Sequence, residues 1–439
     1  MIRHLLFISA VLFAFSVHAQ NREWSLQECV NYALEHNITI KQGELDKEVA
    51  AIDRSVLAGQ MLPSVNANIS GSGNRGLSLN PTTNQLQNAT MISASGSINA
   101  GVSLFEGLKK QRQLQRSKIN ELATSYRLDK MRDDVVLHVA NAFLQVVLNK
   151  ENLDLVKQRN IVTLEQLERT QHLVTAGSLP QGDLLEIRAN DAREKQQIIE
   201  AENQVTISLI SLAQLLRIKD YENFDVEKAD FDIDNQGLEV INVQEYVAKA
   251  REVRSEVKIA ESGVELAEKD IQIARSGYYP TLSAFFGYNT RYAENDPTSF
   301  RKQLSINDGI GYGLQLSIPI FNGLSIRKQV RRSQVGLERA KNELEQAELD
   351  LESSVYQAYM DVRGMSKAYE AAKAALRSQE LAFEHSQNRF DAGLITAFEF
   401  SQAKSRLDQT MIELNQSKFN FIFKQKVLEL YFGVPYSAI

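Results

Sequence analysis

Cysteine is almost absent from this chain of 439 residues, because Cys29 is the only one. A lone cysteine excludes a disulfide within the chain. We therefore expect Cys29 to be a small buried side chain rather than a reactive thiol.

Proline is also scarce, and all seven residues lie in predicted strands, loops or helix ends. Since proline breaks helices, residues 108–174 and 324–390 can be helical throughout. About 66 residues with a rise of 1.5 Å each correspond to a helix of roughly 100 Å. Helices of this length far exceed the needs of a globular core.

Long apolar runs are missing beyond the first 19 residues, so no membrane-spanning helix is predicted there. Residues 1–19 combine Arg3, an apolar run from Leu5 to Val17 and a small-x-small motif, which is typical of a signal peptide. Its removal takes one of 49 basic side chains and none of the 55 acidic ones, so the net charge changes from −6 to −7. The 43% hydrophobic and 24% charged content indicates a folded chain rather than a disordered one.

Motifs for chemistry are missing as well. The six histidines are scattered, with no second metal ligand at helical spacing. Residues 71–76 match a glycine-rich dinucleotide pattern, but a polar loop and not a helix is predicted after them. We therefore predict no enzyme, no cofactor and no nucleic-acid partner.

Two stretches, 90–108 and 310–324, alternate between apolar and mostly small or polar residues, which is the period of a half-buried β-strand. The first is long enough to cross a membrane as a tilted strand. Both end in Phe-x-Gly-Leu, at 105–108 and 321–324, an offset of 216 residues. The chain is therefore interpreted as a tandem duplication.

Each half is predicted to contain a first helix, a β-hairpin, a long helix, a turn and a return helix. The first helices span 25–58 and 242–279, and polar loops are expected at 71–88 and 292–308. The return helix at the end of the chain is expected to stack end to end with the helix 25–58. The predicted boundaries are 20–218 for the first repeat (hairpin 63–106, long helix 108–174, return helix 181–217), 219–241 for an acidic linker, and 242–439 for the second repeat (hairpin 280–322, long helix 324–390, return helix 397–432).

Apolar residues in both long helices recur every seven positions, with one phase shift of four residues at the same place in each half. A seven-residue period predicts coiled-coil packing, and a four-residue shift locally relaxes the supercoil. In the first half this seam comprises Leu128 and Val135, then Val139, Val146, Leu153, Leu167 and Val174.

Four strands are too few to close a barrel, since about eight is the smallest number whose interior side chains can fill. An open sheet edge cannot lie in lipid. The strands must therefore be completed by other copies of the chain: two copies would give a plugged barrel, and three would give 12 strands with a lumen.

Charged side chains gather at two places in this scheme. Asp183, Glu186 and Glu399 follow the two predicted turns and would form a ring of carboxylates that binds cations; solvated helix surface is the alternative. Basic residues follow the strands and would meet lipid headgroups, with a solvated face equally compatible. These are Lys109, Lys110, Arg112, Arg116 and Lys118 in one half and Arg327, Lys328, Arg331 and Arg332 in the other.

The duplicated order of elements resembles the TolC family of outer-membrane efflux and secretion channels, over residues 25–436. This resemblance implies a mainly α fold with membrane β: a homotrimer whose 12-stranded β-barrel, with four strands per chain, is continued by an α-helical coiled-coil tunnel. It also implies strands that begin at Pro63 and Pro280. The tip turns that contact an adaptor would be Ala176, Gly177 and Ser178, and Ala392, Gly393 and Leu394.

The resemblance implies a passive exit duct in the outer membrane of a Gram-negative bacterium, extending into the periplasm. Its partners would be outer-membrane lipid, a periplasmic adaptor and an inner-membrane pump of the RND or ABC type. The family's paired gate carboxylates fall on Glu399 and Gln402, so only one acid is kept there, and Asp183 and Glu186 are candidates to replace the other. A periplasmic coiled-coil adaptor or structural rod remains the alternative.

Overall fold

The computed structural model describes residues 23–79, 84–228, 243–294 and 296–431. The predicted signal peptide and most of the acidic linker lie outside the described residues. The chain forms two compact units. Of the described residues, those within 1–44, 128–257 and 348–439 belong to unit 1, and those within 45–127 and 258–347 belong to unit 2.

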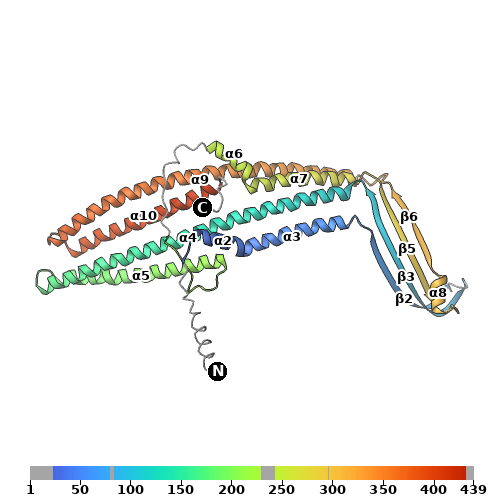
Figure 1. Cartoon of the computed structure of the whole chain (residues 1–439), viewed down its shortest axis with the longest axis horizontal. Coiled ribbons are helices and arrows are strands. Elements are labelled where there is room, and N and C mark those ends of the chain that lie inside the picture. The colour runs from blue at the N-terminus through green and yellow to red at the C-terminus, as the bar shows by residue number, and fades with distance from the viewer. Residues whose placement is uncertain (1–22, 80–83, 229–242, 295, 432–439) are drawn as a thin grey trace, which may run out of the picture. The chain divides into compact units, whose positions relative to one another are not determined.

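Unit 2 contains a four-stranded antiparallel sheet in the order β2-β3-β5-β6 (Figure 1). The strands are β2 (Ser64–Leu79), β3 (Leu86–Glu106), β5 (Thr281–Ala293) and β6 (Gly309–Ser317). Pro63 and Pro280 each lie directly before a strand, where the missing N–H costs no ladder hydrogen bond. Within this sheet β2 and β6 are the edge strands.

The register of the sheet separates apolar from polar side chains. Ile98 faces Tyr288, and Tyr288 faces Ile310, so apolar residues of β3, β5 and β6 share one face. Serines of β2 and β3 share the other face, where Ser70 and Ser72 bond the hydroxyls of Ser95 and Ser93 at 2.8 and 3.0 Å. The apolar face is exposed, with Tyr312 79% accessible.

The connections inside the hairpins differ from the sequence prediction. Most of the loop predicted at 71–88 is strand, because the small residues of 71–79 pair with 86–94 across the ladder. The loop predicted at 292–308 contains a short helix, α8 (Phe300–Ile306). Its buried Gln303 bonds both backbone groups of Ala293, with Oε1 accepting at 2.9 Å and Nε2 donating at 3.1 Å. The second hairpin also ends earlier than 322, since β6 stops at Ser317.

The helices are α2 (Leu26–His36), α3 (Ile38–Gly59), α4 (Lys109–Thr175), α5 (Gln181–Leu216), α6 (Val243–Val253), α7 (Ser255–Ser276), α9 (Ser325–Asp391) and α10 (Ala397–Tyr431). In unit 1 the α4–α5 and α9–α10 turns form two helical hairpins (Figure 1). Ser25, at the predicted start of the first helix, caps α2 in a reciprocal bond with Glu28.

Both first helices are broken, which corrects the prediction of continuous helices at 25–58 and 242–279. The first break lies at Asn37, whose backbone is extended. Its Oδ1 accepts the Thr39 N–H at 2.8 Å and its Nδ2 donates to the Leu215 carbonyl at 3.1 Å. The second break lies at Arg254, whose buried guanidinium pairs with Asp133 at 2.8 Å.

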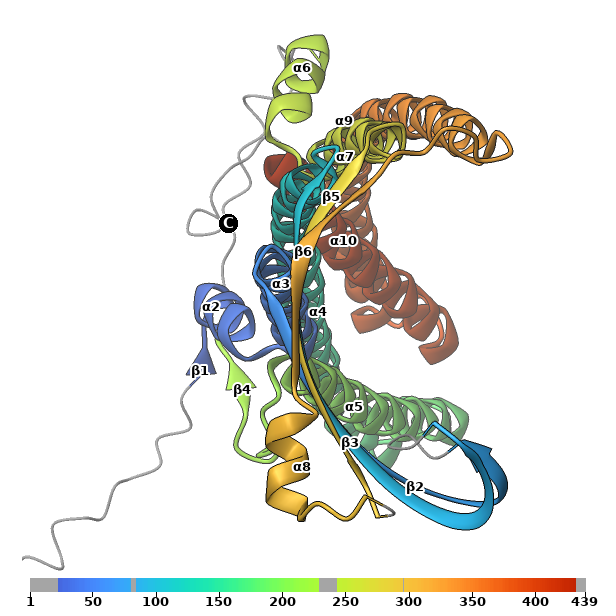
Figure 2. The same ribbon diagram turned by 90° about the vertical axis from the view of Figure 1, so that its right-hand side faces the viewer.

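The helix whose end meets the first break is α5, and not α10 as expected. Arg217, which follows α5, donates to the His36 carbonyl at 3.2 Å. The end of α10 instead lies at the second break, where Arg254 stands 5.2 Å from the centre of the Tyr431 ring. Beside α2, β1 (Glu23–Trp24) pairs in parallel with β4 (Asp225–Val226), so residues 225–226 of the predicted linker form a strand (Figure 2).

The main core of unit 1 surrounds the middle of α4. Four predicted seam residues are buried in it: Leu128, Val135, Val139 and Val146. Cys29 is fully buried in the same core, as predicted. Burial and the nearby carboxylates of Glu28 and Glu227 raise the pKa of its thiol to about 12, so the thiol stays protonated and unreactive.

Candidate functional site: a buried charge cluster near the helical turns

The two turns between the long and return helices have the same construction. Gly177 and Gly393 have positive φ angles of 75° and 72°. The next residues, Ser178 and Leu394, donate to carbonyls five positions earlier at 2.9 and 2.8 Å, which is a Schellman motif. Leu394 is 68% exposed, so the second turn presents an apolar side chain to solvent.

Glu399, a candidate gate carboxylate, caps the first turn of α10. Its Oε2 accepts from the Thr396 N–H at 2.9 Å and from the Thr396 hydroxyl at 3.1 Å. The same hydroxyl accepts from the Glu399 N–H, which completes a capping box. The bonds from the Thr396 backbone and hydroxyl hold the pKa of this exposed carboxyl below its usual range.

The other two candidate carboxylates lie in the first turns of α5. Glu186 pairs with Arg193 at 3.3 Å, while the backbone N–H of Asp183 bonds the Pro180 carbonyl. No hydrogen bond or ion pair within the described part of the chain joins these two acids to Glu399.

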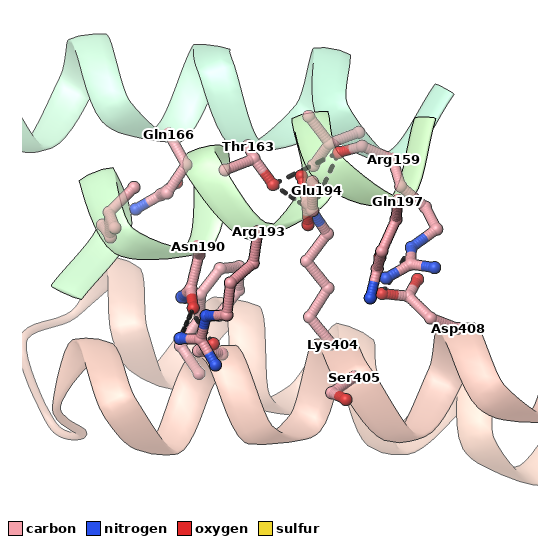
Figure 3. A pocket seen from close by; sticks show the side chains of 14 residues that line it. Arg159, Thr163, Gln166, Asn190, Arg193, Glu194, Gln197, Lys404, Ser405 and Asp408 are labelled. Atoms are coloured by element: carbon pink, nitrogen blue, oxygen red, sulfur yellow. Dashed lines mark hydrogen bonds and ion pairs between the residues drawn. The ribbon is translucent and has the colours of Figure 1, made fainter. Parts of the chain in front are cut away.

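The most buried charges of this region lie deeper, between α4, α5 and α10 (Figure 3). Lys404 of α10 is 8% exposed, and its Nζ donates to the Glu194 carboxylate of α5 at 2.9 Å and to the Arg159 carbonyl of α4 at 2.8 Å. It also bonds the Thr163 hydroxyl. One ammonium group thus connects three helices.

Two further pairs of polar side chains complete this charge cluster. Arg159 of α4 lies with its Nε 2.6 Å from Oδ2 of Asp408 on α10. Asn160 donates to Asp191 at 3.0 Å and to Glu194 at 3.3 Å, both on α5. A cavity of about 110 Å³ lies beside these groups, lined also by Asn190, Gln166 and Ser405 among others. Buried charges with this many partners specify one packing of the three helices.

This charge cluster was not predicted from the sequence, although one residue of α4 indicated it. Asn160 occupies the seven-residue seam of α4, between Leu153 and Leu167. A polar side chain at a seam position requires a partner from a facing helix. The identity of that partner depends on which helices pack against α4, so the spacing alone could not supply it.

No group of three or more potential metal ligands occurs among the residues that the structure describes. Nor does any helix in the described ranges have the length and apolar character to cross a membrane.

Most of both halves of the chain match one known protein family. The model of the family described as "Outer membrane efflux protein" matches residues 29–216 and 246–431, which is most of both halves. The chain belongs to the outer membrane efflux protein family. That family is a class of channels and not of enzymes, and the resemblance to TolC inferred from the repeats is confirmed.

Similar proteins support the assignment of this efflux protein to the family. "Outer membrane protein TolC" of Vibrio cholerae serotype O1 is 23% identical over 445 residues, covering 97% of this chain and 93% of its own. The Campylobacter jejuni CmeC outer membrane channel has a TM-score of 0.78 at 17% identity, covering 94% of this chain and 86% of CmeC. CusC has the same TM-score and identity and covers 95% of each chain. Both solved structures show a shared, mainly helical fold.

In this efflux protein the carboxyl of Asp408, a member of the cluster, has a pKa well above its ordinary value. Burial raises the pKa of its carboxyl to about 6, against the lowering effect of Arg159 and Lys404. The native state therefore keeps, between about pH 4 and 6, a proton that the unfolded chain has released. In that window, stability declines as the pH rises.

We expect the Asp408→Asn variant to remove this pH dependence. In the wild type the Asp408 contribution to the free energy of unfolding falls by up to about 1.4 kcal/mol per pH unit between pH 4 and 6, then levels off. The measurement is the difference in thermal unfolding midpoint between variant and wild type from pH 4.5 to 7.5. Asp46→Asn, at an exposed position of α3, is the control. A difference that does not change with pH would contradict the assignment.

Proposed function

We propose that this outer membrane efflux protein is the passive exit duct of a tripartite efflux pump or a type I secretion system. The observation that carries the proposal is the sheet of unit 2, with its exposed apolar face and its two edge strands β2 and β6. Lipid would cover such a face, but lipid tolerates no open edge. Three copies that pair β6 with β2 of the next copy would close a barrel of 12 strands around the polar face.

Equal element lengths support a duplicated unit. α2 and α6 each have 11 residues, α3 and α7 each have 22, and α4 and α9 each have 67. In a trimer these paired helices would form the wall of a tunnel that extends into the periplasm.

The periplasmic tip would be the pair of turns at 176–178 and 392–394, where an adaptor docks. Lys404 and Asp408 tie α10 to the α4–α5 hairpin. Docking that separates the two hairpins must therefore break these contacts, so the charge cluster would hold the resting state of the tip. The carboxylates of Asp183, Glu186 and Glu399 would line the opening, and an inner-membrane pump of the RND or ABC type would supply the energy.

A periplasmic adaptor or structural rod would also contain long helical hairpins. Such a protein has no use for an apolar strand face, whereas here Tyr312 and Leu314 of β6 are 79% and 68% exposed. The sheet thus favours the duct.

The test is the assembly and conductance of the protein in detergent and in planar bilayers. We expect the purified protein to have the mass of a trimer in mass photometry and to form ion-conducting channels after insertion into the bilayer. After crosslinking, we expect the adaptor to copurify with it. A monomeric, water-soluble protein without β signal in circular dichroism would overturn the proposal.

The same recordings test the carboxylates. The Asp183→Asn/Glu186→Gln/Glu399→Gln variant is expected to lose block by divalent cations, because three negative charges leave each chain. A variant with Thr396→Ala alone controls for loss of the capping box of α10. Unchanged block would remove these residues from the gate.

A further inference from the structure

The basic residues that follow the strands are used differently in the two halves of unit 2. In α4, Arg112 donates to the Gln272 carbonyl at 2.6 Å, and Arg116 pairs with Asp270 at 2.6 Å. Lys110 donates to the Gln60 carbonyl at 2.7 Å. These cations therefore hold helices of the same chain together.

The corresponding cations of α9 have no such use. Arg327 and Lys328 are exposed and make no side-chain hydrogen bond or ion pair among the residues described. Arg331 has only a loose contact, 3.8 Å long, with the exposed Glu338. Internal packing thus does not explain these charges.

The local sequence leaves this positive charge uncompensated. Between Asp308 and Glu338 the chain contains four basic residues and no acidic one. Charge concentrated in this way attracts an anionic surface, and the attraction is strongest within a Debye length of it.

The segment between β6 and α9 adds an apolar element directly before these cations. Ile318, Ile320 and Phe321 are 59%, 95% and 81% exposed. Ile318 and Ile320 follow directly after the end of β6, whose exposed residues Leu314 and Leu316 precede them in the sequence. Exposed apolar residues and a neighbouring basic cluster are the two features that together bind a protein segment to a membrane surface.

We propose that the connection between β6 and α9, residues 318–332, binds the headgroups of anionic phospholipids, with Ile320 and Phe321 at the level of the acyl chains and Arg327, Lys328 and Arg331 at the phosphates. The proposal rests on the proposed membrane position of the sheet. It assigns the contact to the second half of the chain, because Lys110, Arg112 and Arg116 of α4 already bond groups of the same chain. We call residues 318–332 the basic elbow.

The experiment measures lipid selectivity in proteoliposomes. Wild-type protein is reconstituted in phosphatidylcholine vesicles with spin-labelled phosphatidylglycerol or phosphatidylcholine, and the protein-associated fraction of each probe is determined. We expect the wild type to bind a larger fraction of phosphatidylglycerol than of phosphatidylcholine. The ratio of the two protein-associated fractions should be roughly tenfold lower in the Arg327→Gln/Lys328→Gln/Arg331→Gln variant. High salt should reduce the wild-type preference toward that of the variant.

The matched control is Arg363→Gln/Lys367→Gln/Arg377→Gln, which removes the same charge from exposed positions of the same helix. It is expected to keep the wild-type selectivity. An equal loss of the phosphatidylglycerol preference in both variants would mean that only the net charge of the protein matters, which would overturn the proposal. Displacement of the labelled lipid by inorganic phosphate, at the ionic strength of a chloride control, would overturn the commitment to lipid.

Channel conductance and trimer mass are recorded on the same samples. Conducting trimers with no phosphatidylglycerol preference would overturn the lipid contact and leave the duct intact. Absence of conducting trimers in the wild type would overturn the duct itself. A basic-elbow variant that fails to form trimers would show that these cations bind the next copy of the chain, which also overturns the proposal.

Discussion

Replacing Lys404 by alanine is expected to cost about 3–5 kcal/mol, the usual loss when one member of a buried ion pair is removed. The substitution leaves the Glu194 carboxylate, the Thr163 hydroxyl and the Arg159 carbonyl without the ammonium group that connects them. Because the lost contacts join α10 to α4 and α5, we also expect the channel to spend more time in a higher-conductance state. Denaturant unfolding and single-channel recordings measure the two effects.

Arg406→Ala is the matched control for Lys404→Ala, since Arg406 is exposed on α10 two residues away. A change there should stay within about 0.5 kcal/mol, as for most surface substitutions. The double variant Lys404→Met/Glu194→Leu removes both charges and keeps similar volumes. It should recover most of the stability, since a buried pair replaced by apolar groups costs little. If the double variant were as unstable as Lys404→Ala, the unpaired carboxylate would not be the cause.

Alanine at Gly107 is expected to destabilise unit 2 far more than alanine at Gly323, although the two glycines occupy equivalent places. Both have a φ of 62°, which costs a residue with a Cβ about 1–2 kcal/mol. A Cβ at Gly107 would lie 2.7 Å from the Ser276 carbonyl oxygen and 2.7 Å from Tyr279 Cβ. A Cβ at Gly323 would meet nothing within 4 Å.

Overpacking against fixed atoms adds typically about 1–3 kcal/mol, so we expect roughly 2–5 kcal/mol for Gly107→Ala against roughly 1–2 kcal/mol for Gly323→Ala. The yield of heat-resistant trimers and the thermal midpoint of the strand signal in circular dichroism compare the two variants. Equal losses would mean that the left-handed backbone alone matters and that the close approach of Ser276 and Tyr279 relaxes freely.

Much of the fold could be predicted because its signals are local. Strand alternation, the start of the first helix at residue 25 and the glycines of the two turns all depend on residues a few positions apart. The structure places a helix, strand or turn at each of these positions. The breaks at Asn37 and Arg254 were missed because they depend on partners far along the chain, the Leu215 carbonyl and the Asp133 carboxylate.

The candidate site was only partly predictable for the same reason. The turns and the carboxylates near them could be located from glycine and acid positions. The charge cluster could not, because Lys404 lies 210 residues from Glu194 and neither stands out among the 104 basic and acidic residues of the chain. Only the polar Asn160 in an apolar seam marked where such a cluster was needed.

The sequence by itself determined the periods: strands of alternating polarity, helices of 67 residues without proline, and two halves in the same order. These follow from backbone geometry and side-chain spacing, which are properties of each segment alone. The tertiary structure decided which charged side chains form ion pairs within the molecule. Arg116 is paired and Arg327 is not, although both follow a strand, because Asp270 of α7 lies 2.6 Å from the Arg116 side chain, and no carboxylate in the described ranges lies within ion-pair distance of Arg327.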